Sequence, residues 1–187
     1  MEIGDVLRGM LMYFLLPLWL GAGFADYLCH RAAHIERTSG WQESVLHLVQ
    51  FTEMAIPVLA ALFLEITSGV ILLMIICLIL HQATAIWDVR YADGKRQITP
   101  TEQHVHSILE MLPLTAILMV IALYWPAFAG LFGSGASDFA LRPKPEPLPV
   151  IYIATMLGLT ALFELLPYLE ELARTLRHRH KRARPAE

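Results

Sequence analysis

The chain has 187 residues, of which 56% are apolar and 17% are charged, and its formal net charge is −3 at pH 7. Soluble domains typically carry about 25% charged residues, so the composition excludes an ordinary soluble domain and favours an integral membrane protein. The length leaves no room for a separate soluble domain beside the predicted spans. The two cysteines lie in apolar, helix-like segments and indicate no disulfide framework.

Hydropathy and helix-end signals predict an all-α fold with five membrane-spanning helices in one domain, residues 1–187. A span needs about 20 mostly apolar residues. The expected helices cover about residues 6–36, 40–66, 69–91, 100–127 and 150–176, and a basic tail follows at 177–187. The apolar run 10–24 lacks the basic start of a secretory signal, so we expect a retained helix, with Pro17 tolerated inside it.

Local signals place the helix ends. Ser39 is an expected N-cap of the second helix, and Thr99, Pro100 and Glu102 form a capping box with proline at the first helical position of the fourth. The stretch 130–149 is rich in glycine and proline and is typical of a long surface loop.

The basic residues predict the orientation in the membrane. They concentrate in the connections between the first and second and the third and fourth helices, and in the tail. The positive-inside rule then places the C-terminus in the cytoplasm and the N-terminus outside, as in a bacterial inner-membrane protein. We interpret the tail as a topology signal that also contacts anionic lipid, and we expect no nucleic-acid partner.

With this topology, acidic and histidine side chains gather at the cytoplasmic ends of four helices. Within each helix they are spaced four or seven residues apart and so lie on one face. Ionisable groups inside a membrane are costly, and a pair of metal cations would compensate several carboxylates at once. The candidate ligands are Asp26, His30, His34, Glu43, His47, His81, Asp88, Glu102, His104, His106 and Glu110.

Mixed carboxylate and imidazole ligands favour two iron ions, with manganese or zinc as alternatives. In its ligands the sequence resembles the di-iron carboxylate bundles, in which Glu and His from four helices surround two metals. It is also similar to membrane-bound di-iron oxygenases and desaturases in placing ligands at the cytoplasmic ends of spanning helices. The resemblance is to a class and covers about residues 26–110. The segments "EQHVH", "ESVLH" and "HSILE" contain neither an E-x-x-H motif nor the H-x-x-H-H boxes of desaturases.

Several candidates have a structural alternative. Glu102 fits a capping box equally well, His34 and His104 fit an interfacial position, and Asp88 has Arg90 nearby as a surface partner. A polar network without metal, or a proton relay, is the alternative for the set Asp26, His30, Glu43, His47, His106 and Glu110. Thr84, Glu164 and Tyr168 are expected to support the ligands or to carry protons.

The favoured function is an oxidoreductase that activates dioxygen at two irons and oxidises a lipid-like substrate, which reaches the site between the helices. An electron donor would be a partner of such an enzyme. The alternatives are a metal or proton transporter, a membrane zinc hydrolase, and a haem-binding or purely structural bundle. The sequence indicates neither the substrate nor the oligomeric state.

Overall fold

A computed structural model describes residues 2–134 and 137–183 of the chain. The fold is all-α and 79% helical, and the described residues form no strand. Residues 135–136 of the predicted loop and 184–187 of the predicted tail lie outside the described residues. Five helical segments are long and apolar enough to cross a membrane, which is compatible with an integral membrane protein.

The five segments follow one another along the chain. The first is Ile3–Ala32, built from α1 (Ile3–Met10), the π-helical segment η1 (Leu11–Leu15) and α2 (Leu16–Ala32). The next three are α3 (Trp41–Phe63), α4 (Ser68–Asp93) and α5 (Pro100–Leu123). After the short helix α6 (Trp125–Gly130), the last segment joins α7 (Val150–Thr160), the π-helical segment η2 (Ala161–Leu165) and α8 (Leu166–Ala183).

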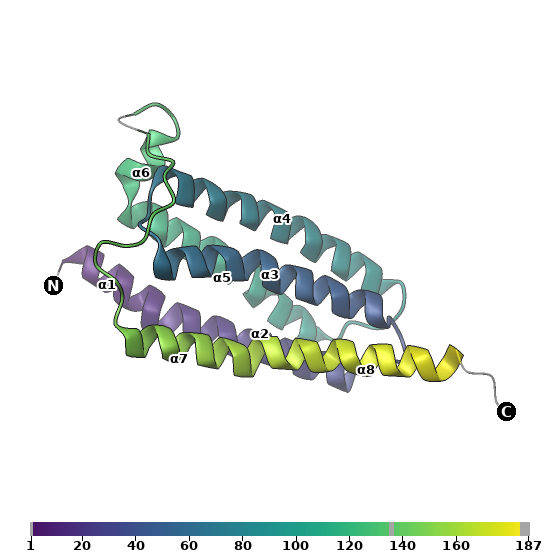
Figure 1. Ribbon diagram of the computed structural model, residues 1–187. Helices are drawn as coiled ribbons and strands as arrows, with labels where there is room; N and C mark the ends of the chain where they lie inside the picture. Colours follow the sequence, from purple (N-terminus) through teal and green to yellow (C-terminus); the bar gives the residue numbers. More distant parts are fainter. Residues whose placement is uncertain (1, 135–136, 184–187) are drawn as a thin grey trace.

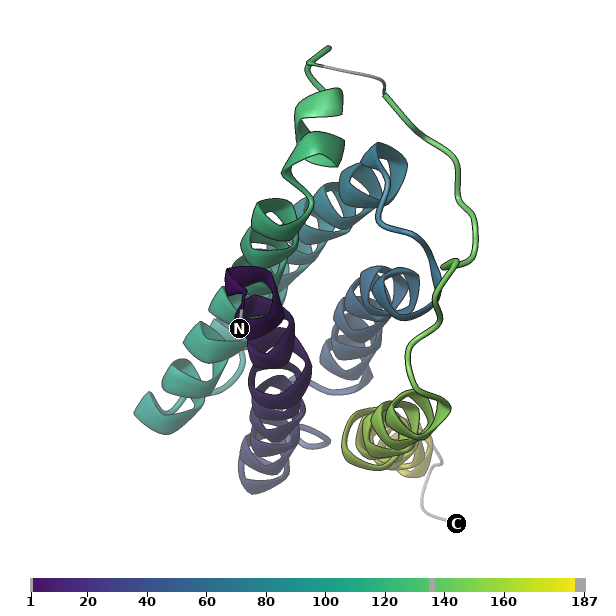
Figure 2. The same cartoon turned by 90° about the vertical axis from the view of Figure 1, so that its left-hand side faces the viewer.

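The five segments form a closed ring. The helix α2 packs against α5 on one side and against η2 and α8 on the other, α8 packs against α3, α3 against α4, and α4 against α5. Figure 1 shows the long helices side by side, and Figure 2 looks along the bundle from the end where the N-terminus lies. The interior of the ring is therefore bordered by all five segments, and the last one is part of the wall.

The first helix ends at Ala32, four residues earlier than predicted, because a Schellman motif closes it. The N–H of Ile35 donates to the carbonyl of His30 and the N–H of His34 to that of Arg31, the bond pattern that satisfies the last carbonyls of a helix. His34 adopts φ = 50°, the left-handed conformation that glycine usually occupies there. Ile35 is fully buried as the hydrophobic contact of this motif.

Three further helix ends differ from the prediction. The second spanning helix ends at Phe63, not at residue 66, because the following backbone pairs with the loop before α7: Glu65 donates to the Arg142 carbonyl, and Lys144 donates to that of Phe63. The fourth ends at Leu123, and α6 begins as a separate helix at Trp125, with Pro126 in its first turn. The last helix continues through Ala183, so the described part of the predicted tail is helical.

Two of the prolines coincide with irregular helical turns. Pro17 and Pro167 each lie two residues after a π-helical segment, η1 or η2. A proline has no N–H to give to the carbonyl four residues before it, and its ring collides with that carbonyl. That carbonyl belongs to Tyr13 in η1 and to Phe163 in η2. The wider π turn accommodates the proline without ending the helix.

Apolar and polar residues occupy opposite ends of the ring. At the end that holds the loop before α7, a buried apolar group is formed by Ala60, Ile66, Val70, Ile71, Met74 and Ile117. The loop docks there through backbone contacts, since the N–H of Gly69 donates to the carbonyl of Asp138. The buried charged residues lie toward the other end, where α2, α4 and α8 end and α3 and α5 begin.

Candidate metal centre

Ionisable side chains from all five spanning segments converge inside the ring. We call this group the polar cluster. It consists of Asp26 and His30 from α2, Glu43 and His47 from α3, Asp88 from α4, Arg96 from the α4–α5 connection, Glu102 and His106 from α5, and Glu171 from α8. Eight of these nine residues are buried, and the side chain of His106 is only 12% exposed. The sequence prediction placed seven of them at one level.

Glu171 holds two of the histidines at the same time. One carboxylate oxygen lies 3.2 Å from Nδ1 of His30 and the other lies 2.7 Å from Nδ1 of His47. The two imidazole rings are nearly parallel, with an interplanar angle of 6° and ring centroids 4.1 Å apart. A carboxylate that accepts Nδ1–H leaves Nε2 as the lone-pair nitrogen, which is how proteins orient histidine ligands of metals.

The two Nε2 atoms face further carboxylates at 3.3 to 3.6 Å. Nε2 of His30 lies 3.5 Å from Oδ2 of Asp26 and 3.6 Å from Oε1 of Glu102. Nε2 of His47 lies 3.3 Å from Oδ2 of Asp88. Among the described residues, neither Nε2 atom has a hydrogen-bond partner, although both are buried. Two ligands bound to one cation at about 2.1 Å are about 3.0 to 3.4 Å apart, close to these separations.

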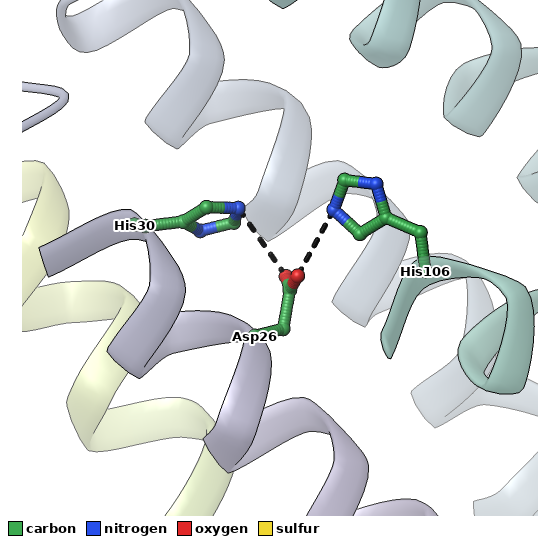
Figure 3. Close-up of side chains that lie close together, drawn as sticks. All are labelled: Asp26, His30 and His106. Carbon is green, nitrogen blue, oxygen red and sulfur yellow. Dashed lines mark ion pairs between the residues drawn. The ribbon is translucent and has the colours of Figure 1, made fainter. Parts of the chain in front are cut away.

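Asp26 connects His30 with the histidine of α5. Figure 3 shows its carboxylate between the rings of His30 and His106, and Nε2 of His106 lies 2.9 Å from Oδ1 of Asp26. Asp26, His30 and His106 each offer a ligand atom within 4.8 Å of one another, and so do His30, Glu43 and His47. Two sets of three potential ligands therefore adjoin at His30.

Arg96 closes the cluster from the connection between α4 and α5. Its Nη2 atom lies 2.6 Å from Oε1 of Glu43 and 2.5 Å from Oε1 of Glu102. Burial alone disfavours the charged guanidinium, but the hydrogen bonds that Arg96 donates to Glu102 and Glu43 outweigh burial and hold the pKa of Arg96 above its ordinary value. The guanidinium thus compensates one negative charge permanently.

Glu102 combines the two roles that the sequence left open. It forms the capping box at the start of α5, since its N–H donates to Thr99 Oγ1 at 3.2 Å and its side chain accepts from the Thr99 N–H. The same carboxylate binds Arg96 and approaches Nε2 of His30. Capping and membership of the cluster are therefore compatible.

The charges of the cluster do not balance by themselves. Five buried carboxylates stand against one guanidinium, which leaves a surplus of four negative charges when the three imidazoles are neutral. Buried charge without compensation is costly. Two divalent cations would neutralise this surplus.

Four of the predicted ligands lie apart from the cluster. His34 is exposed at the end of the first helix, where Nδ1 lies 3.4 Å from Glu36, and His104 is exposed on α5. His81 is buried beside Glu53, with 3.9 Å between Nδ1 and Oε2. Glu110 lines the cavity described below but is outside both sets of three ligands.

The predicted supporting residues lie in different surroundings. The Thr84 hydroxyl donates to Glu53 at 2.9 Å, on the side of His81. Tyr168 and Glu164 are buried in the last spanning segment, and the Tyr168 ring lies 6.0 Å from that of His47. The backbone of Gly23 approaches Glu164 so closely that a Cβ atom there would overlap the carboxyl group.

An apolar cavity of about 350 Å³ opens directly onto the cluster. Asp26, His47, Asp88 and His106 contribute to its wall at one end, together with Glu164 and Tyr168. The remaining wall is mainly aliphatic and aromatic, with side chains such as Trp19, Phe51 and Met54. A mostly apolar pocket with a few converging polar groups is typical of a small-molecule site.

Sequence reasoning missed Glu171 and Arg96 as members of the cluster. Glu171 follows Glu164 by seven residues and Tyr168 by three, so it shares their helical face. That periodicity is a signal for an inward-facing carboxylate, but the fifth helix was expected only to pack beside a four-helix site. Arg96 lies in a polar connector with no periodicity, and only the tertiary contacts identify it.

No protein-family model, no curated protein sequence and no solved structure matches this chain.

Proposed function

We propose that the polar cluster binds two metal ions inside the membrane-spanning bundle. The observation that carries this proposal is the pair His30 and His47, whose Nδ1 atoms share Glu171 while their buried Nε2 atoms face carboxylates at 3.3 to 3.6 Å without hydrogen bonds. Metal-bound histidines commonly donate their second N–H to a carboxylate in this manner.

The donor set supports iron first and manganese or zinc next, because carboxylates and imidazoles are present and no thiolate takes part in either set of three ligands. It does not suit a haem with two histidine ligands. Such ligands approach the iron from opposite faces, whereas the rings of His30 and His47 are stacked and their Nδ1 atoms meet the same carboxylate.

The apolar cavity supports a hydrophobic, lipid-like substrate. Its wall joins the cluster to aliphatic side chains of the membrane-spanning segments, and such a surface favours a hydrocarbon chain over a hydrated ion. This supports an enzyme over an ion transporter. Bound iron would supply dioxygen activation: one oxygen atom would enter a C–H bond of the substrate and the other would leave as water, with two electrons from an external electron donor and two protons from solvent.

In this proposal the residues of the chain have distinct roles. Asp26, His30, Glu43, His47, Asp88 and His106 would hold the metal ions, and Glu102 would assist them from the start of α5. Glu171 orients two imidazoles, and Arg96 maintains the positive charge beside Glu43 and Glu102. The surrounding helices keep water away, which strengthens each of these interactions.

The test is the metal content of purified protein and of four histidine variants. We expect about two metal ions per chain and a large loss in His47→Ala and His106→Ala. The matched controls are His104→Ala, which changes an exposed histidine two residues from His106, and His34→Ala, which changes the exposed histidine after α2. Both controls should keep the full metal content.

Folding is followed by thermal denaturation in the same samples, so that metal loss from a damaged fold is recognised. Full metal content in both His47→Ala and His106→Ala would contradict the proposed centre. One metal ion per chain in folded wild-type protein would contradict the dinuclear arrangement. Loading metal-free protein with iron, manganese or zinc in parallel then identifies the preferred metal.

A further inference from the structure

A second cavity extends the first one toward the opposite end of the bundle. Its volume is about 480 Å³. The two cavities adjoin along shared wall residues, which are Leu16, Trp19, Met54, Val58 and Leu62. The residues that line the combined space extend from Asp26 in the polar cluster to Arg8 in α1 and Lys144 in the loop before α7. Each volume lies within the range of ligand pockets.

The far end of this space is marked by two basic residues. Arg8 from α1 and Lys144 from the loop before α7 line the second cavity. Glu65 and Glu146 line it as well. Glu65 forms an ion pair at 2.5 Å with Arg142, a residue that does not line the cavity. Glu146 is exposed. Arg8 is exposed as well, and its one ion pair with a described residue is a long contact with Asp5, at 3.8 Å.

Lys144 has no ion-pair partner within 4.0 Å among the described residues. Its side chain forms neither an ion pair nor a hydrogen bond there, although the residue is partly buried. Burial is the main cause that lowers the pKa of Lys144; the charge of Glu65 opposes burial, and the smaller effect of Arg8 acts in the same direction as burial. Two neighbouring cations at the mouth of an apolar cavity, one of them without a partner, are suited to an anionic head group.

We infer that the joined cavities bind a lipid with a single apolar chain and an anionic head group, a carboxylate or a phosphate monoester. The head group lies between Arg8 and Lys144, and the chain extends past Trp19 and Val58 toward Asp26. This inference rests on the proposed function only for the reaction at the cluster. Binding itself requires the cavity and the two cations.

The geometry also predicts which part of the lipid chain contacts the polar cluster. Arg8 and Asp26 are 18 positions apart in one helical segment, which corresponds to about 27 Å at 1.5 Å per residue. The hydrocarbon layer of one bilayer leaflet is only about 15 Å thick, which is shorter than the distance from Arg8 to Asp26. A chain held by its head group at Arg8 and Lys144 therefore presents its far end to the polar cluster, and long chains are preferred over short ones.

The head-group site is tested by ligand binding to metal-free protein in detergent, so that the result does not depend on the metal. The probes are a long-chain fatty acid, an alkyl phosphate and an alcohol, all of the same chain length. We expect Arg8→Gln/Lys144→Gln to weaken binding of one or both anionic probes about tenfold or more and to leave the alcohol unchanged. Lys95→Gln, an exposed lysine at the opposite end, is the control.

The path of the lipid chain is tested at the wall that the two cavities share. Val58→Phe narrows the cavity at this wall. The variant should bind a long-chain fatty acid much more weakly than the wild type does, while binding of a short-chain fatty acid should change much less. Ile56→Phe is the control, since Ile56 lies on the same helix and is 44% exposed outside both cavities. Thermal denaturation shows whether each variant is folded.

Three results would overturn the inference. One is equal binding of the fatty acid, the phosphate and the alcohol to the wild type, and another is unchanged affinity in the Arg8/Lys144 double variant. The third is equal competition by a two-chain phospholipid, because the space would then hold ordinary bilayer lipid. The metal content is measured on separate samples, so failure of the metal proposal and failure of lipid binding remain distinguishable.

Discussion

The imidazole rings of His30 and His47 stack face to face, 4.1 Å apart between centroids, although the two residues come from different helices. Glu171 explains this arrangement because its two carboxylate oxygens meet the two Nδ1 atoms. Each ring then turns Nε2 toward the other carboxylates of the polar cluster. Glu171, a residue of the last helix, thus orients both rings through their Nδ1 atoms.

Replacement of Glu171 tests this orientation. A carboxylate accepts two N–H groups, whereas the amide of Glu171→Gln accepts on its oxygen alone, so one histidine loses the acceptor for Nδ1–H. We expect metal affinity to fall about 10- to 100-fold, as for other residues that orient metal ligands. Titration against a competing chelator measures it, with Glu170→Gln, the partly exposed neighbour, as the control. Equal affinities in the two variants would show that Glu171 does not orient ligands.

The position of Arg96 between Glu43 and Glu102 predicts that metal binding and the stability of the fold are coupled. In Arg96→Gln, Glu43 and Glu102 lose their buried cation, and breaking a buried ion pair typically costs about 3 to 5 kcal/mol. The metal-free protein should be destabilised most, because bound cations replace part of the missing charge. Metal should therefore raise the melting temperature more in Arg96→Gln than in the wild type or in Arg90→Gln, an exposed control on α4. An identical increase in all three proteins would refute this coupling.

His34 is predicted to act as a helix terminator. Its φ of 50° is a conformation that costs a residue with a side chain about 1 kcal/mol relative to glycine. His34→Gly should therefore raise the free energy of unfolding without changing the metal content. His104→Gly, within the helix α5, should lower it by roughly 0.3 to 0.5 kcal/mol, because glycine has a lower helix propensity than histidine. Chemical denaturation of both variants shows whether each change raises or lowers the free energy of unfolding. Metal loss in His34→Gly would instead identify His34 as a metal ligand.

Gly69 is predicted to be required for docking of the loop before α7. A Cβ atom there would lie 2.7 Å from the carbonyl oxygen and 2.9 Å from Cα of Phe139, both in the backbone. Gly69→Ala should destabilise the protein by about 1 to 3 kcal/mol, as overpacking does. Gly158→Ala is the control, since its Cβ would meet nothing within 4 Å and alanine favours a helix. Comparable melting temperatures of the two variants would contradict this role.

The all-α architecture and the spanning helices follow from local properties of the sequence. Long apolar runs exceed the length needed to cross a bilayer, and the capping box at Thr99 and Glu102 determines the start of α5 within a few residues. The spacing of four between Asp26 and His30, and between Glu43 and His47, places each pair on one helical face. These features depend on neighbours in the chain, so the sequence alone determines them.

Other features depend on contacts between segments far apart in the chain. Helical periodicity defines a face but not the rotation of a helix about its axis, so it could not separate Asp88, which faces His47, from His81, which faces Glu53. The closure of the ring by α8 brings Glu171 to His30, 141 positions away. Packing of whole helices decides such distances, and for that reason only the tertiary structure revealed the roles of Glu171 and Arg96.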